Sequence, residues 1–98
     1  MQIGACKIYL RLPENDTLKG KRSVKNSMAG RIKSRFNVAV AEVDDNDHWR
    51  QLTLGVVCVS NDARHANEVL SSVVELVSLG HWDAELLDYE IEVFPALS

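Results

Sequence analysis

Hydrophobic and polar residues alternate along the first segment of the chain, from Gln2 to Leu12. Successive side chains of a β-strand point to opposite faces, so this period of two predicts a strand with one buried side. Pro13 marks its end, because proline has no backbone N–H for strand pairing. Near the end of the chain, the same alternation predicts a last strand that stops at Pro95 and has apolar positions at Leu87, Tyr89, Ile91 and Val93.

A helix is predicted after the first strand, because the apolar residues there recur every four positions. We expect it to begin near Leu18, with Thr17 or Asp16 as its cap, and to stop at Asn37. Its apolar stripe consists of Val24, Met28, Ile32 and Phe36.

A second helix is expected later in the chain, opening at Ser60–Asp62 with Ser60 or Asn61 as its cap and closing at Gly80. Asp62 would then be favourable in its first turn. Its apolar face consists of Ala66, Val69, Leu70, Val73, Val74 and Val77.

Between the two helices, the pattern predicts strands over 38–43 and 51–59, joined as a hairpin by the polar turn Asp44–Asp47. The element order is then β-α-β-β-α-β within a single domain spanning residues 1–98. Right-handed crossovers place the strands in the order 4-1-3-2 with both helices on one face. The predicted fold is therefore an α+β ferredoxin-like two-layer sandwich with an antiparallel sheet.

Composition fits this picture, since 46% of the 98 residues are hydrophobic and 26% are charged, as in an ordinary globular protein. No apolar run approaches the roughly 20 residues of a membrane-spanning helix, so no membrane contact is expected. No export signal precedes the first strand, which leads us to expect a cytoplasmic protein. Cys6 and Cys58 lie within predicted strands and are expected to be reduced core thiols.

Charge is distributed unevenly along the chain. Seven of the eleven Lys and Arg residues lie between Lys19 and Arg35, and no Asp or Glu lies between Thr17 and Ala41. Surface helices usually interleave acidic residues that pair with their cations. The unmatched cations predict binding of an anionic partner such as RNA phosphates, through Lys19, Lys21, Arg22, Lys25, Arg31, Lys33 and Arg35. Alternatively, the helix is merely solvated, and the acidic turn or a second subunit balances its charge.

Several stretches carry a family resemblance: Arg11–Pro13, Leu18–Val24, Arg35–Val43, Leu54–Val56 and Val59–Asp62. Together they resemble the YlxP-like family of bacterial domains of unknown function, over almost the whole chain. The resemblance implies a ferredoxin-like fold. Family members are often encoded among translation and ribosome-maturation factors, so it also implies a role near RNA or the ribosome. It implies no catalytic residue.

One position departs from the family pattern. Gly20 stands where Glu would complete a capping box with Thr17. Glycine also weakens a helix by roughly 1 kcal/mol relative to alanine. A less regular first turn is therefore expected.

The outer face of the sheet is the second candidate surface. If the large apolar residues of the strands point toward the helices, small and apolar side chains are left on the other side, and exposed apolar patches mark interfaces. RNA-recognition domains use such a face for base stacking, but this one offers only one aromatic ring. Homodimerisation fits better, through Tyr9, Ala39, Ala41, Thr53, Gly55 and Val57.

No pattern in the sequence indicates an enzyme. The acidic strand Glu85–Glu92 is interpreted as a solvated edge that resists edge-to-edge pairing. Trp49 and Trp82 are interpreted as lids over the ends of the core. The histidines have no nucleophile or metal ligand at readable spacing, so no cofactor, metal or small-molecule substrate is expected at His48, His65 or His81. The sequence therefore predicts a non-enzymatic RNA- or ribosome-associated module, with a homodimeric interaction module as the alternative.

Overall fold

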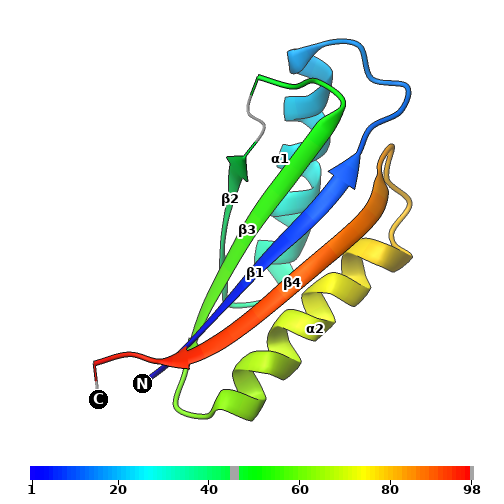
Figure 1. Cartoon of the computed structure of the whole chain (residues 1–98). Coiled ribbons are helices and arrows are strands. Elements are labelled where there is room, and N and C mark those ends of the chain that lie inside the picture. The colour runs from blue at the N-terminus through cyan, green and yellow to red at the C-terminus, as the bar shows by residue number, and fades with distance from the viewer. Residues whose placement is uncertain (45–46, 98) are drawn as a thin grey trace.

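The computed structural model describes residues 1–44 and 47–97 of the chain (Figure 1). A four-stranded antiparallel sheet carries two helices on one face, which confirms the predicted ferredoxin-like fold. The elements are β1 (Gln2–Arg11), α1 (Leu18–Arg35), β2 (Ala39–Asp44), β3 (Gln51–Ser60), α2 (Ala63–Leu79) and β4 (Glu85–Pro95).

The strands lie in the order β2-β3-β1-β4, which is the predicted order read from the opposite edge. β1 pairs with β3 and β4 along its whole length, so both halves of the chain are joined at the centre of the sheet. The two chain ends meet at one corner, where the Ala96 amide donates to the Met1 carbonyl over 2.8 Å. The edges of the sheet are β2 and β4.

The core lies between the sheet and the helices, and β1, α1, β3 and α2 bury the apolar sides that their patterns predicted. Met28 and Ile32 of α1 and Leu70 and Val73 of α2 are fully buried. They meet the inner faces of β1 and β3, formed by Cys6, Ile8, Leu10, Leu52, Leu54 and Val56. Burying a side chain of this size contributes about 1.5–3 kcal/mol to the free energy of unfolding.

Two local expectations change. Asp62 itself caps α2, since its side chain accepts a hydrogen bond from the Arg64 amide over 2.9 Å.

In β4, the pairing with β1 shifts between Tyr9 and Leu10, so Leu87 falls at an irregularity and is 58% exposed. Leu86 packs against the core in its place. An extra residue in one strand reverses the side on which its neighbours point.

Strand β2 also carries an irregularity, between Glu42 and Asp44. Before it, Val40 and Glu42 pair with Val56 and Leu54, so both lie on the face that the helices cover. A charged residue thus faces the interior of the sandwich beneath α1.

Candidate nucleic-acid interface

The seven basic residues of α1 separate into one buried side chain and six that remain accessible. Lys21 is only 3% exposed, and its Nζ lies 2.7 Å from Oε2 of Glu42. The same ammonium donates to the carbonyls of His48, over 2.7 Å, and Gln51, over 3.1 Å. Lys21 therefore holds α1 against β2 and the start of β3. The expectation that it contacts phosphates is wrong.

The other six basic side chains are Lys19, Arg22, Lys25, Arg31, Lys33 and Arg35, and we call them the basic surface. Lys25 is half-buried and the others are exposed. None of the six forms an ion pair within the described part of the chain. At 3.6 residues per turn, Arg31 and Arg35 flank the stripe on the side of α2, whereas Lys19, Arg22 and Lys33 lie on the outer side.

The acidic turn does not balance this charge within the described residues. Asp44 lies 2.8 Å from Lys7 Nζ, on the outer face of the sheet. Asp47 is exposed and forms no ion pair with α1 among the described residues. Asp45 and Asn46, which belong to the same predicted turn, lie outside the described residues.

The first turn of α1 is regular, although glycine occupies its third position. Thr17 caps the helix, and its Oγ1 accepts a hydrogen bond from the Gly20 amide over 2.9 Å. A Cβ at Gly20 would lie 2.1 Å from Asn15 Oδ1. Asn15 is held there by its Nδ2, which donates to the carbonyls of Thr17 and Trp49. Gly20 thus makes room for the side chain that ties this loop to the β2–β3 connection.

Trp82 lies between two grooves that run along the flank of α1. Its indole Nε1 donates to the Val77 carbonyl over 3.0 Å, and its ring packs against the core, as the lid interpretation predicts. Gly80 permits this position, because a Cβ there would lie 2.1 Å from Trp82 Nε1. Trp49, by contrast, is 48% exposed, so the lid interpretation does not hold for it to the same extent.

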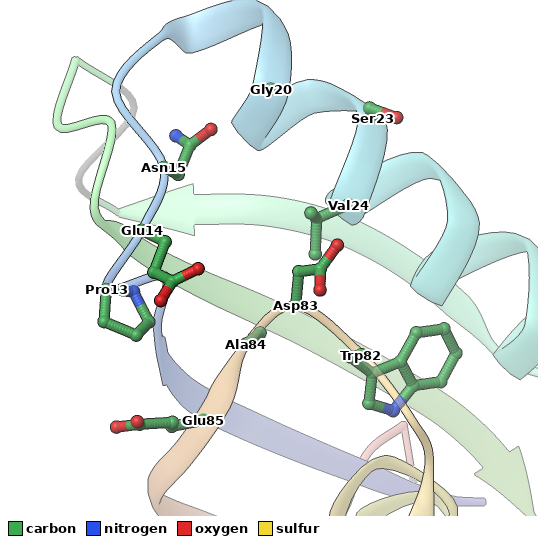
Figure 2. Close-up of a pocket in the computed structure, with 10 residues that line it drawn as sticks. All are labelled: Pro13, Glu14, Asn15, Gly20, Ser23, Val24, Trp82, Asp83, Ala84 and Glu85. Atoms are coloured by element: carbon green, nitrogen blue, oxygen red, sulfur yellow. The ribbon is translucent and has the colours of Figure 1, made fainter.

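The first groove, of about 610 Å³, has acidic walls (Figure 2). Glu14 and Asp83 extend into it, whereas Glu85 points away. Among the described residues, no group of three or more His, Cys, Asp or Glu is arranged to hold a metal ion.

The second groove, of about 600 Å³, separates α1 from the C-terminal half of α2, and we call it the basic groove. The Arg31 guanidinium lies 6.0 Å from the centre of the Trp82 ring, at the outer limit of a cation–π contact. Sequence reasoning missed this groove, because its walls come from segments about forty residues apart. The side chains that give it its character are Arg31, Arg35, Phe36, Glu75, His81 and Trp82.

The outer face of the sheet is only partly open. Thr53 is 2% exposed, and the Val43 side chain lies over Gly55, where an added Cβ would meet Val43 at 2.7 Å. The Tyr9 hydroxyl donates to Glu90 over 3.2 Å. Half of the predicted interface residues are thus buried or engaged within the chain, and at Gly55 the cause is the β2 irregularity, which brings Val43 across this face. The exposed members are Ala39, Ala41 and Val57.

Both cysteines are buried and unlinked. Burial raises the pKa of the Cys6 thiol to about 11, and burial also raises the pKa of Cys58. Reactive thiols have a lowered pKa and are accessible, so neither cysteine has the character of a nucleophile. No helix within the described residues is long and apolar enough to cross a membrane.

Comparisons with known proteins give a family but no activity. The model of the family described as "Protein of unknown function (DUF503)" matches residues 3–91. The uncharacterized protein YlxP of Bacillus subtilis (strain 168) is 28% identical over 72 residues, which cover 74% of each chain. The crystal structure of a mutant of SnoaB, a cofactor-independent oxygenase from Streptomyces nogalater, shares 15% identity with a TM-score of 0.46, covering 99% of this chain and 94% of that one.

Proposed function

This chain belongs to the family described as protein of unknown function (DUF503), and from its surface we propose that it is a non-enzymatic RNA-binding module that holds phosphates along α1. The observation that carries the proposal is the basic surface: six accessible cations on one helix without an acidic partner among the described residues. Like charges on one helix repel one another unless an anion lies against them. A polyphosphate chain supplies such an anion in a linear array.

The buried pair beneath the helix supports this proposal in a second way. Because Lys21 is fixed to Glu42, to the His48 carbonyl of the β2–β3 connection and to the Gln51 carbonyl at the start of β3, the helix that carries the other cations is rigidly placed. Charges on a rigid element lose less conformational entropy when they bind. Ribosomal RNA is the first candidate, since it offers dense phosphates in a fixed geometry.

Cosedimentation with ribosomal subunits, and titration of a labelled RNA, across a salt series test the proposal. We expect log affinity to fall linearly with log salt, by about 0.7–0.9 for each phosphate contacted. The triple variant Lys19→Ala/Arg22→Ala/Lys33→Ala should weaken binding to every RNA sequence alike, because phosphate contacts carry no sequence information.

A matched control removes the same charge elsewhere. Lys7, Arg11 and Arg64 lie outside α1 and are exposed, so replacing all three by alanine changes the net charge equally. If both triple variants lose affinity to the same extent, binding follows net charge alone, and α1 is not the interface. Absence of binding at the lowest salt would reject the proposal.

We propose homodimerisation through the outer face as a second candidate function, on one observation. Val57, Val59 and Phe94 are exposed on this face by 42%, 64% and 39%, although they are large and apolar. Sedimentation at tens of micromolar tests it: the native chain should have the mass of a dimer, and Val59→Asp should be monomeric. Leu79→Asp, at an equally exposed apolar residue of α2, is the control that should leave the mass unchanged. A monomeric native chain would exclude this candidate.

A further inference from the structure

We propose that the basic groove binds one unstacked nucleotide of single-stranded RNA, with the phosphate against α1 and the base against Trp82. The inference rests on the proposed function and adds where, and in which form, the RNA is held. A volume of about 600 Å³ lies within the range of pockets that enclose small ligands.

The α1 wall supplies the phosphate contacts. Arg31 and Arg35 are exposed, lie one helical turn apart and both line the groove. Guanidinium groups hold phosphate oxygens in a bidentate manner, which a point charge cannot do.

The aromatic side chains of the groove supply a surface for the base. Phe36 and Trp82 are half-buried, so each is fixed against the core while the groove reaches part of its ring. Stacking on such rings is a sequence-tolerant way of holding unpaired bases. The Arg31–Trp82 contact is at its distance limit, so an entering base can replace it at little cost.

The α2 wall has the opposite character. Glu75 lines it, and α2 ends there at Leu79, where the last carbonyls of the helix carry partial negative charge. These groups repel phosphate and accept hydrogen bonds from base amino groups or ribose hydroxyls. The complementary ligand is therefore anionic at one side, flat in the middle and a donor at the other side. A nucleotide has this arrangement, whereas free phosphate does not. Paired bases of a duplex are not available to the groove.

Tryptophan fluorescence provides a direct test, because the chain has two tryptophans and Trp49 lies outside the groove. In the Trp49→Phe variant, single-stranded octaribonucleotides should quench the remaining fluorescence, since stacking brings a base against Trp82. A duplex with the same number of phosphates should bind through the basic surface and quench little. The quenching experiment leaves the groove intact, so it does not depend on a substitution within the core.

Three variants test the contribution of Trp82 and of the two arginines to binding. Trp82→Leu should lower the affinity for the single strand about tenfold without changing the salt slope, and Trp82→Phe should restore most of it. Arg31→Ala/Arg35→Ala should lower both the affinity and the salt slope for the single strand. Thermal unfolding of each variant shows that the chain remains folded.

The outcomes separate this inference from the proposal on which it rests. If RNA binds but neither single strand nor duplex quenches Trp82, and Trp82→Leu binds like the native chain, the groove is not the site and α1 remains the interface. If no RNA binds at low salt, both are rejected. Quenching by the single strand together with the tenfold loss in Trp82→Leu establishes the groove as the nucleotide site.

Discussion

Lys21 and Glu42 form an ion pair between α1 and the inner face of β2, with 2.7 Å between Nζ and Oε2 and side-chain exposures of 3% and 16%. Burying a charge is costly unless a partner and further hydrogen bonds compensate it. The carbonyls of His48 and Gln51 complete the coordination of the ammonium. The pair thus joins the helix, the edge strand and the β2–β3 connection at one point.

Replacing Lys21 by methionine should lower the free energy of unfolding by about 3–5 kcal/mol, because it leaves Glu42 as an unpaired buried charge. Lys19→Met is the matched control: that side chain is exposed, and its loss should change stability by no more than about 0.5 kcal/mol. Urea unfolding followed by circular dichroism measures both. Equal stability of the two variants would show that the Lys21 pair contributes little.

The two glycines of α1 should respond in opposite directions to alanine. Gly20→Ala places a Cβ 2.1 Å from Asn15 Oδ1, so the loop must release hydrogen bonds to Thr17 and Trp49. Gly30→Ala meets nothing within 4 Å and should stabilise the helix by about 0.5–1 kcal/mol. Thermal unfolding of the two variants should move the midpoint down for Gly20→Ala and up for Gly30→Ala. A higher midpoint for Gly20→Ala would contradict the packing of Asn15.

Gly80→Ala should displace the Trp82 ring without breaking α2, because the new Cβ would occupy the place of the indole Nε1. The hydrogen bond from that nitrogen to the Val77 carbonyl would then be lost. In a Trp49→Phe background, we expect the fluorescence maximum to shift to longer wavelength as the ring becomes more hydrated. Ser78→Ala, two residues earlier and exposed, should leave the spectrum unchanged.

Alkaline pH should weaken the fold through Cys6. Its folded pKa is raised to about 11 from 9.0 by burial, so the unfolded thiol ionises before the folded one does. The stabilisation is therefore present below pH 9 and is lost as the pH rises toward 11. Burial also raises the pKa of Cys58, and the hydrogen bond to Asp44 raises the pKa of Lys7. Both groups are present in wild type and in Cys6→Ala, so a comparison of the two proteins isolates the contribution of Cys6. The fall in unfolding free energy should be shallower in Cys6→Ala, and identical slopes would contradict the assignment.

Periodicity predicted the six elements and their order because each one buries a single face, and the buried residues of β1, α1 and α2 match that pattern. It could not predict the irregularities of β2 and β4, since one extra residue leaves no signature in composition. Lys21 had the same appearance as its basic neighbours. Its position was nevertheless a signal for burial, because Lys21 lies seven residues before Met28 and so falls on the buried stripe of the helix. Glu42, which shares its side of the strand with Val40, supplies the matching charge.

The candidate site, like the fold, could be predicted from the sequence only in part. The charge of the basic surface is visible in the sequence, because it depends only on the helical segment itself. The basic groove depends on how far α1 stands from α2 and on the placement of Trp82 by Gly80. Such features arise from packing between distant segments, so local patterns cannot reveal them.

The separation of charge across the sheet has a consequence for diffusion. α1 packs beside β2 at one edge, whereas β4 at the opposite edge exposes Glu85, Asp88, Glu90 and Glu92. With a net charge of −3, the chain as a whole is repelled by a polyanion, yet it has a permanent dipole moment across the sheet. In the field of a polyanion the molecule would rotate before contact and arrive with α1 foremost. Under the proposed function, the acidic edge would make orientations with β4 foremost unfavourable, so that the encounter with RNA would become selective before any side chain touches it.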